Sequence, residues 1–556
     1  MAEITADQAP VGAARVTPMF TVVAASAAGT AFEWYDFFIF GSLTQVISKV
    51  FFAGLNDTAG TIAALALFGV GFAFRPLGAL VFGHVGDRLG RKGAFLVTVV
   101  MMGGATFAIG FLPTYAQAGI WSPILLILMR VIQGFALGGE YGGAAIYVAE
   151  HSSPGRRGWN TSWVQTSAAF GLFGALGVIL LTRKTLGEDV FATVGWRIPF
   201  LVSAGLLAVS VWMRQKLGES PAFSQIKAEG TATKAPYAEA FGKWSNLKLV
   251  ILAFLSMMSA QGAVWYCSFF YIQVFMEKFL KVDPATINLL MMAATVASAP
   301  LYVFFGWLSD KIGRKIVMLA GMSLALIAFF PGFHALEQAA NPALAVASAH
   351  TPVVVIADPA DCALQFDPVG KAAFVSSCDI AKSFLANGGV SYANQAAPAG
   401  TVASVKIGDK LVVVSKSAKA LPKADAKAVK AGVEAQLKAA LKTAGYPAKA
   451  DPARVDLKTM FAVLMVFVVA ATALFGPLAA CLVELFPTRV RYTAMSLPYN
   501  IGTGWIGGFL PFTAFAIVAA RGDIYSGLWY PVFFTLISVV TTLFFLPETK
   551  GRPLNT

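Results

Sequence analysis

The chain alternates between long apolar runs and short polar connections. An α-helix needs about 20 predominantly apolar residues to cross a lipid bilayer. Runs of this kind form two groups of six, which predicts twelve transmembrane helices. The first group lies at 19–49, 59–83, 94–113, 121–149, 161–182 and 196–213, and the second at 249–276, 286–308, 316–336, 457–484, 493–519 and 526–546.

Two longer polar stretches interrupt this pattern. The stretch 214–248 separates the two groups, and the stretch 337–456 separates the ninth apolar run from the tenth. We therefore expect five segments along the chain. These are a six-helix bundle at 1–213, a central cytoplasmic loop at 214–248, helices seven to nine at 249–336, an inserted domain at 337–456, and helices ten to twelve with a tail at 457–556.

Composition and charge support a membrane protein and give it an orientation. Hydrophobic residues make up 57% of the chain and charged residues only 13%, which a soluble surface of this size does not accommodate. The net charge of +13 comes largely from basic residues in alternate loops, which argues against nucleic-acid binding and places both termini in the cytoplasm. The loops 50–58 and 114–120 on the opposite side contain no Lys or Arg. The basic loops contain Arg88, Arg91 and Lys92, Arg156 and Arg157, Lys311, Arg314 and Lys315, Arg489 and Arg491, and Lys550 and Arg552.

An internal repeat locates an insertion. Residues 83–92 and 306–315 share the spacing Gly-x3-Asp-Arg/Lys-x-Gly-Arg-Lys and lie 223 positions apart. Glu150 and Glu484, each followed by a proline and two arginines, lie 334 positions apart. The difference of 111 residues must be inserted between 315 and 484, on the outer face of the membrane.

The insertion has local signals of secondary structure. We expect a strand at 352–356, a hairpin at 402–415 and a Lys-rich amphipathic helix at 423–444, and hence a small α+β domain outside the membrane. Cys362 and Cys378 would then lie in an oxidising compartment and are candidates for a disulfide. A disordered Ala/Lys loop with free thiols is the alternative. The domain could also contact a periplasmic partner.

Charged residues within the apolar runs are costly in a membrane and therefore indicate function. Glu33 and Asp36 lie three residues apart, on one face of the first helix. Desolvation and mutual repulsion would keep one of them protonated near neutral pH, as a proton carrier requires. Alternatively, the two acids form structural pairs with Arg75 or Arg130.

The fourth run contains Arg130 and Glu140. A guanidinium in the middle of the membrane can bind a carboxylate or influence a nearby acid. Glu140 is a second candidate proton site, or else a partner for Arg75. Candidate residues of a substrate cavity are Arg75, Arg130, Gln165, Gln261, Tyr266, Tyr499 and Asn500.

Other chemistry is not indicated. Residues 83–92 lack the Gly-Lys-Ser/Thr ending of a nucleotide-binding phosphate loop. The four cysteines and four histidines show neither metal-ligand spacing nor a convincing catalytic set. We therefore expect no enzyme, no metal and no cofactor, and energy drawn from a gradient or from the substrate itself. The charged residues of these loops, together with Gly83, are more readily interpreted as latches between conformations: Gly83, Asp87, Arg88, Arg91, Asp310, Arg314, Glu150, Arg157, Glu484 and Arg491.

These motifs together resemble a known family. Residues 83–92, their echo at 306–315, and Arg130 with Gln133 and Gly134 resemble the major facilitator superfamily. The segments 33–37, 138–142, 195–200 and 219–221 narrow the resemblance to its metabolite:proton symporters, over 18–336 and 457–552. The resemblance implies two six-helix bundles, alternating access and proton symport across a bacterial inner membrane. It also implies gating by Asp87, Arg88 and Arg91 and proton coupling through Arg130.

The leading hypothesis is proton-coupled uptake of a small organic acid by a monomer. The carboxylate would bind Arg130 or Arg75, and the proton would bind Glu33, Asp36 or Glu140. A second hypothesis is uptake of a zwitterionic osmolyte of the proline or betaine type, held in an aromatic cage. A third is a transporter-like sensor whose inserted domain receives a ligand or partner.

Overall fold

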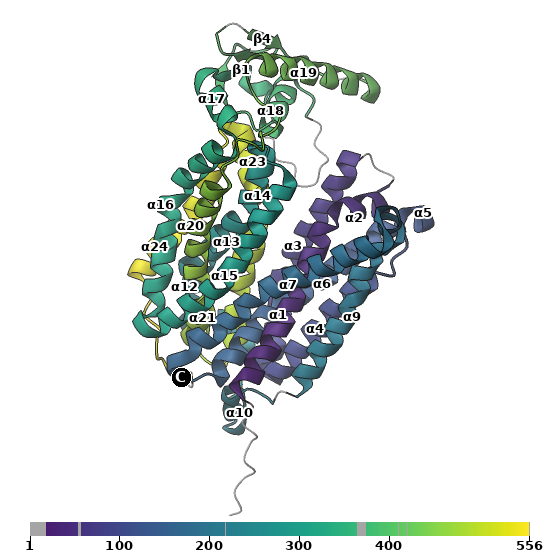
Figure 1. The fold of residues 1–556 in the computed structure, drawn as a ribbon. Helices are drawn as coiled ribbons and strands as arrows, with labels where there is room; N and C mark the ends of the chain where they lie inside the picture. The colour runs from purple at the N-terminus through teal and green to yellow at the C-terminus, as the bar shows by residue number, and fades with distance from the viewer. Residues whose placement is uncertain are drawn as a thin grey trace, which may run out of the picture.

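The computed structural model describes residues 18–53, 57–216, 218–363, 374–409, 411–419 and 421–554. The chain forms two helical halves that lie side by side, with a small α/β domain above one of them (Figure 1). The main helices of the first half are α1 (Met19–Ser42), α3 (Asp57–Leu89), α4 (Arg91–Ile109), α6 (Trp121–His151), α7 (Arg157–Leu186) and α9 (Arg197–Gln215), with the short α2 (Thr44–Phe51) and α5 (Tyr115–Ala118).

The second half begins after two short helices of the central stretch, α10 (Pro221–Ala228) and α11 (Pro236–Phe241). Its first long helical stretch, Trp244–Phe279, starts as α12 (Trp244–Ala253) and includes α13 (Ser259–Tyr266). The others are α15 (Pro284–Ile312), α16 (Arg314–Ala340), α20 (Leu457–Phe475) continued by α21 (Leu478–Leu485), α22 (Arg491–Asn500) continued through η7 (Ile501–Gly507) to α23 (Leu510–Arg521), and α24 (Trp529–Phe544).

Ten helical stretches within the described residues are long and apolar enough to cross a membrane. The helices α1 and α3 are not among them. Both contain charged side chains, Glu33 and Asp36 on α1 and Arg75 on α3, and both pack within the first half, α1 on α7 and α3 on α6. The expected total of twelve spans therefore stays a prediction.

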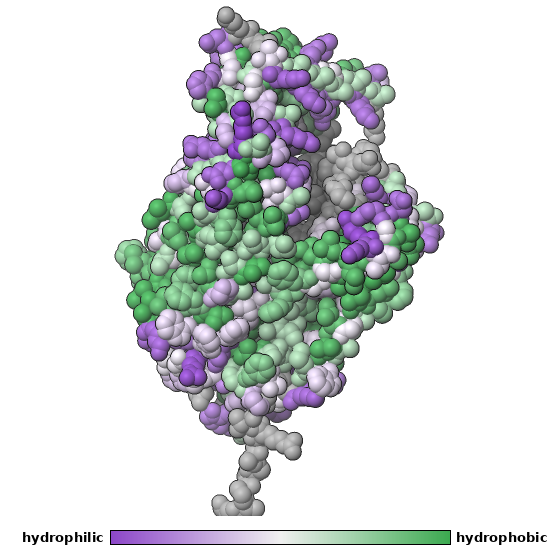
Figure 2. Space-filling model, in the orientation of Figure 1, coloured by the Kyte–Doolittle hydropathy of each residue, from purple (hydrophilic) through white to green (hydrophobic). Residues whose placement is uncertain are grey.

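The bundle has two distinct ends. The described chain finishes at one of them, which we call the terminal end, and the inserted domain lies at the other, the insertion end (Figure 1). On the face shown in Figure 2, a broad belt of apolar residues covers the bundle between these ends. Such a belt is what a bilayer requires of the protein surface that it contacts.

The inserted domain contains a four-stranded sheet in the order β2-β1-β3-β4. The strand β1 (Val353–Ala357) pairs in parallel with β2 (Tyr392–Ala396) and antiparallel with β3 (Ser404–Ile407), which forms a hairpin with β4 (Leu411–Val414). Alternate residues of β1 and β3 are buried, as expected for a sheet with one covered face. The covering helices are α18 (Ser377–Asn387) and α19 (Lys423–Thr443). The expected strand, hairpin and basic helix are all present, whereas β2 was not expected.

A disulfide joins Cys362, which follows β1, to Cys378 in the first turn of α18. Nearby, Asp361 accepts hydrogen bonds from Lys419 and from Ser377, the latter at 3.0 Å. Partial desolvation opposes ionisation, but these hydrogen bonds outweigh it and hold the pKa of Asp361 below its usual value. The disulfide and this ion pair thus fix the same corner of the domain.

The inserted domain is attached to the second half by backbone hydrogen bonds. The Tyr392 amide donates to the Gly522 carbonyl at 2.6 Å, next to the end of α23. The Ala450 amide donates to Lys281 at 3.1 Å. These two contacts hold the inserted domain against the second half.

Candidate functional site

A cavity lies between the two halves, in the middle of the bundle. One wall comes from α1, α3 and α6 of the first half, and the other from α13, α20 and the α22–η7 segment of the second. Because both halves contribute, movement of one half against the other changes its shape. The polar lining residues are Glu33, Asp36, Arg75, Arg130, Gln133, Gln261, Tyr266, Tyr499 and Thr503, and the aromatic and aliphatic ones include Trp34, Phe37, Phe72, Leu137, Trp265 and Phe475.

Glu33 and Arg75 form an ion pair on the cavity wall, with Arg75 Nη2 donating to Glu33 Oε1 at 3.0 Å. The Glu33 side chain is 12% exposed, and Arg75 is its single ion-pair partner among the described residues. The Arg75 guanidinium also lies over the Phe72 ring, 4.8 Å from its centroid. The acid and base of this pair are both within reach of a molecule in the cavity.

Asp36 is held by a larger network. Gln133 Nε2 donates to Asp36 Oδ1 at 2.8 Å, and Thr106 Oγ1 donates to the same oxygen at 2.9 Å. Arg130 Nη1 lies 3.4 Å from Asp36 Oδ2 and donates to Gln133 Oε1 at 2.9 Å. The Asp36 side chain is only 3% exposed. Three hydrogen-bond donors thus surround the Asp36 carboxyl group and fix its position on the cavity wall.

Aromatic rings make up much of the remaining wall. Trp34 of α1 and Trp265 of α13 face each other across the two halves, with ring centroids 5.2 Å apart. Tyr141 of α6 stacks on Tyr499 of α22 at 3.9 Å, again across the interface. Such a wall can stack on a ring or surround a methylated ammonium group.

The structure brings most of the predicted cavity residues together. Arg75, Arg130, Gln261, Tyr266 and Tyr499 all line the cavity. Two predicted residues lie elsewhere and need correction.

Gln165 lines a neighbouring pocket and donates to the Tyr141 hydroxyl at 2.7 Å. Asn500 does not line the cavity, because its amide donates to the Gly138 carbonyl at 2.8 Å and to Ser496 at 2.9 Å. It tethers α22 to α6, where the absence of a side chain at Gly138 leaves the carbonyl accessible.

Glu140, a predicted proton site, needs a third correction. Its partner is Arg214 at 3.2 Å, where Arg75 was the expected one. Arg214 was expected in the central loop but lies in the last turn of α9, 2% exposed, with its guanidinium 3.5 Å from the Phe95 ring centroid. Glu140 does not line the cavity. The pair ties α6 to α9 within the first half.

At the terminal end, Asp87 joins the two halves. Its carboxylate accepts from the Tyr492 amide at 3.1 Å and from the Thr493 amide at 2.7 Å, in the first turn of α22. The exposed N–H groups of a helix start favour an anion there. Arg91 donates to the same carboxylate and to the Thr488 carbonyl, the latter at 2.7 Å.

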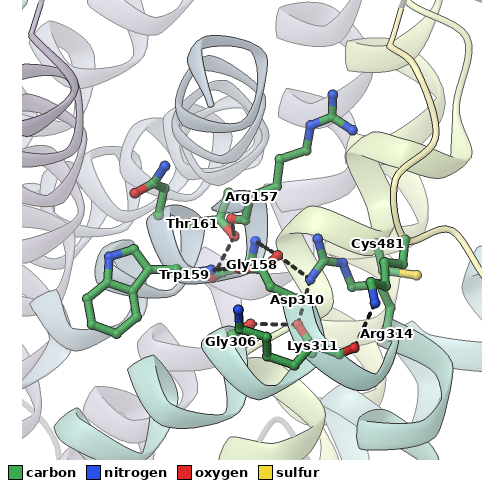
Figure 3. A network of polar contacts seen from close by, with 12 residues as sticks. Arg157, Gly158, Trp159, Thr161, Gly306, Asp310, Lys311, Arg314 and Cys481 are labelled. Atoms are coloured by element: carbon green, nitrogen blue, oxygen red, sulfur yellow. Dashed lines mark hydrogen bonds and ion pairs between the residues drawn. The ribbon is translucent and has the colours of Figure 1, made fainter. Parts of the chain in front are cut away.

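Asp310 occupies the equivalent place in the repeat and makes the corresponding contact with a helix of the first half (Figure 3). It accepts from the Gly158 amide at 3.0 Å and from the Trp159 amide at 2.8 Å, in the first turn of α7. Arg314 pairs with it at 2.6 Å. Each half thus contributes one aspartate to a helix start of the other half.

Two crossed ion pairs accompany these contacts. Arg491 of the second half lies 2.7 Å from Glu150 of the first, and Arg157 of the first lies 3.4 Å from Glu484 of the second. Arg314 also contacts Glu484, at 3.3 Å. All five side chains are buried. The terminal end is therefore closed by a double, symmetric ionic latch.

The glycines that open the repeated motifs allow this closure. A Cβ on Gly83 would lie 2.8 Å from Thr493 Cα, and one on Gly306 would lie 2.5 Å from the Gly158 carbonyl. Arg88 is the predicted gating residue that stays outside: it is exposed, and no described acid pairs with it. At the insertion end, by contrast, a hollow separates the two halves (Figure 2).

No group of three or more potential ligands among the described residues could hold a metal ion. Three residues of these networks were not predicted from the sequence. Thr106 of α4 hydrogen-bonds Asp36, and Arg214, outside the cavity, pairs with Glu140 over a separation of 74 residues. Gln133 lines the cavity, and its place in the motif with Arg130 and Gly134 is the signal that could have assigned it to the site.

Family models match the chain at 21–239 and 441–556, as sugar (and other) transporter, and at 261–351, as major facilitator superfamily. Together with the metabolite-transporter relatives below, these matches decide the family. The chain belongs to the major facilitator superfamily, in its metabolite:proton symporter group. Its relatives are transporters rather than enzymes, as the motifs predicted.

Among curated relatives, the shikimate transporter of Escherichia coli is 38% identical over 320 residues, which cover 56% of this chain and 71% of the relative. The proline/betaine transporter of Salmonella typhimurium is 36% identical over 56% of this chain and 63% of its own length. The chain thus spans less than two thirds of that second relative.

Solved structures confirm the fold of the superfamily. A proton:xylose symporter bound to 6-bromo-6-deoxy-D-glucose is similar with a TM-score of 0.62 and 15% identity, covering 97% of this chain and 98% of that chain. An inward-open xylose transporter from E. coli gives a TM-score of 0.53 at 16% identity, over 96% of this chain and 98% of that chain.

Proposed function

We propose that this protein is a secondary active transporter that takes up a small organic acid together with a proton, by alternating access. The observation that carries the proposal is the Glu33–Arg75 ion pair on the cavity wall, at 3.0 Å. A buried guanidinium needs an anionic partner, because an uncompensated charge in a low-dielectric site is costly. Glu33 is that partner while no substrate is bound.

This arrangement couples proton and substrate. Protonation of Glu33 neutralises the acid and leaves Arg75 without a counter-charge. The carboxylate of an incoming substrate can then replace it in a bidentate contact. The charge of Arg75 is balanced either by the ionised Glu33 or by the substrate carboxylate. A proton on Glu33 therefore accompanies each carboxylate that binds. Release of the two on the other side restores the ion pair.

Glu33 is a better proton carrier than Asp36. Three hydrogen-bond donors surround Asp36, and its side chain is 3% exposed against 12% for Glu33, so a proton from the cavity reaches Glu33 more readily. We assign Asp36 to a structural role, in which it orients Arg130 and Gln133 on the cavity wall. Arg130 is then a second anchor for a polar group of the substrate.

We further propose an orientation. The basic loops gather at the terminal end, which supports placing that end in the cytoplasm of a bacterial inner membrane. The latch through Asp87 and Asp310 would then close the cytoplasmic side, and the hollow at the insertion end would give access from outside. The inserted domain would lie in the periplasm.

A zwitterionic osmolyte is the second candidate substrate. The aromatic cavity wall that includes Trp34 and Trp265 favours it, since aromatic ring faces bind a quaternary ammonium group. The relatives include both substrate classes, shikimate and proline/betaine. In an osmolyte complex the carboxylate would still bind Arg75.

The proposal is tested by uptake into proteoliposomes under an imposed pH gradient, with a panel of labelled organic acids and osmolytes. Glu33→Gln should abolish proton-driven accumulation and leave substrate counterflow active. Asp36→Asn, the matched variant, should lower both processes together, because it disturbs the cavity wall. Accumulation by Glu33→Gln at the wild-type level would refute the coupling role, and transport of none of the compounds would refute the function.

A further inference from the structure

A groove that faces outward runs between α1 and α7 at the terminal end of the first half. Its walls are apolar: Phe20 and Val23 project from α1, and Trp163 and Phe170 from α7. Phe20 is 83% exposed and Phe170 is 70% exposed. The cavity mechanism uses none of these side chains.

The groove has one polar end. Arg156 lies there, exposed, in the turn η1 (Pro154–Arg156) that joins α6 to α7, with His151 and Asn160 beside it. One apolar stretch ends at His151 and the next begins at Pro154. Arg156 therefore lies at the level where the hydrocarbon region gives way to lipid headgroups.

The internal repeat supplies a comparison. Arg489 follows Pro487 as Arg156 follows Pro154, two positions later. Arg489 pairs with a carboxylate of the protein, Glu239, at 3.4 Å. Arg156 has no such partner among the described residues, and no Asp or Glu lines its groove.

A second groove lies on the other side of α7. Trp159 and Trp163, whose ring centroids are 5.8 Å apart, form a ridge that lines both grooves. The far wall of the second groove belongs to α15 of the other half, with Phe304 and Trp307. This pair of grooves thus offers two apolar channels beside one cation.

We propose that the paired grooves bind an anionic phospholipid of the surrounding membrane. Its phosphate contacts Arg156, and its two acyl chains lie on either side of the Trp159–Trp163 ridge. The free arginine supplies the charge complementarity, and tryptophan is enriched where a membrane protein meets lipid headgroups. Because the second groove joins α7 to α15, the bound lipid contacts both halves of the transporter.

The test uses the full-length protein in detergent micelles, titrated with phosphatidylglycerol or phosphatidylcholine that carries bromine on its acyl chains. Bromine quenches tryptophan fluorescence on contact. We expect phosphatidylglycerol to quench at about a five-fold lower mole fraction, since one basic residue near the headgroups contributes about that factor. Arg156→Gln should remove this preference, and Arg156→Lys should keep it.

Two further variants localise the effect. Arg489→Gln, the matched control at the other arginine of the repeat, should retain the full preference. The triple variant Trp159→Phe/Trp163→Phe/Trp307→Phe, which removes every tryptophan that lines the two grooves, should lose the phosphatidylglycerol-specific part of the quenching. Equal quenching by the two lipids in the wild type, or an unchanged preference in Arg156→Gln, would overturn the proposal, and neither outcome depends on which substrate is transported.

Discussion

Arg214 Nη2 lies 3.2 Å from Glu140 Oε1, and both side chains are buried between α6 and α9. The guanidinium rests directly on Gly29 of α1, where an added Cβ would lie 1.5 Å from Nη2. Three helices of the first half thus meet at one ion pair. Because Glu140 does not line the cavity, we interpret the pair as structural and not as a proton site.

We therefore expect Glu140→Gln to lower stability without removing proton coupling. Loss of one partner from a buried ion pair costs about 3–5 kcal/mol, so the thermal midpoint of the purified protein should fall by several degrees. Gly29→Ala should lower it as well, since the guanidinium must move. Glu188→Gln is the control, because its pair with Arg183 is 70% exposed at the acid and contributes little.

Transport by Glu140→Gln should still respond to a pH gradient at a temperature where the variant is folded. If this variant keeps its thermal midpoint but accumulates substrate independently of pH, then Glu140 carries the proton and the assignment to Glu33 is wrong.

The latch at the terminal end leads to a second prediction. Glu150→Gln removes the acidic partner of Arg491, whose side chain is only 1% exposed. Since the contact exists only in the closed arrangement, its loss favours the open one. A cost of about 3 kcal/mol would move a closed population of 99% to roughly 40%.

Spin labels at Leu89 and Ile312, two exposed and repeat-related positions at the terminal end, can report this opening. We expect a longer distance component to appear in Glu150→Gln and to be absent from Arg489→Gln, in which the 47% exposed Arg489 loses its pair with Glu239. A distance distribution that stays the same in Glu150→Gln would contradict the latch.

The sequence predicted the fold and the outline of the site, because both depend on local patterns. Apolar runs, the repeat offsets and the charged residues within the runs are all visible along the chain. Glu33, Asp36, Arg75 and Arg130 could be chosen because a charge in a membrane helix has few structural reasons to be there.

The pairing of these charges could not be predicted in the same way. In the sequence, Arg214 is the first basic residue after an apolar run, a position that indicates a loop. Its burial depends on the Glu140 carboxylate, 74 positions away. Asn500 has the side chain of a ligand-binding residue, but Gly138 on another helix leaves a carbonyl within its reach. Such partners depend on the helix packing and have no periodicity of their own.

The disulfide of the inserted domain should stabilise that domain. Cys362 and Cys378 are 16 positions apart, and closing a loop of about this length stabilises a fold by about 3 kcal/mol, chiefly by restricting the unfolded chain. We expect a Cys362→Ser/Cys378→Ser variant to be cleaved much faster by trypsin within 353–443, at the many lysines there. Reductant should have the same effect on the wild type and none on the variant. A wild type whose cleavage is insensitive to reductant would contradict this expectation.

The ion pair beside that disulfide predicts a dependence on acid pH. The pKa of Asp361 lies below its ordinary value of 3.8, because hydrogen bonds from Lys419 and Ser377 outweigh partial desolvation. A carboxyl with a lowered folded-state pKa stabilises the fold above the unfolded-state pKa, and this contribution is lost as the pH falls through the folded-state value. The wild type should therefore exceed Asp361→Asn in stability at pH 5–7, and the difference should shrink below about pH 4.

Pulse proteolysis of the full chain with an acid-active protease measures the ratio of the intact fractions of wild type and Asp361→Asn at each pH. Asp409→Asn, at an exposed position of the same domain, is the control and should follow the wild type throughout. A constant ratio between wild type and Asp361→Asn from pH 7 to pH 3 would show that the charge of Asp361 does not stabilise the domain.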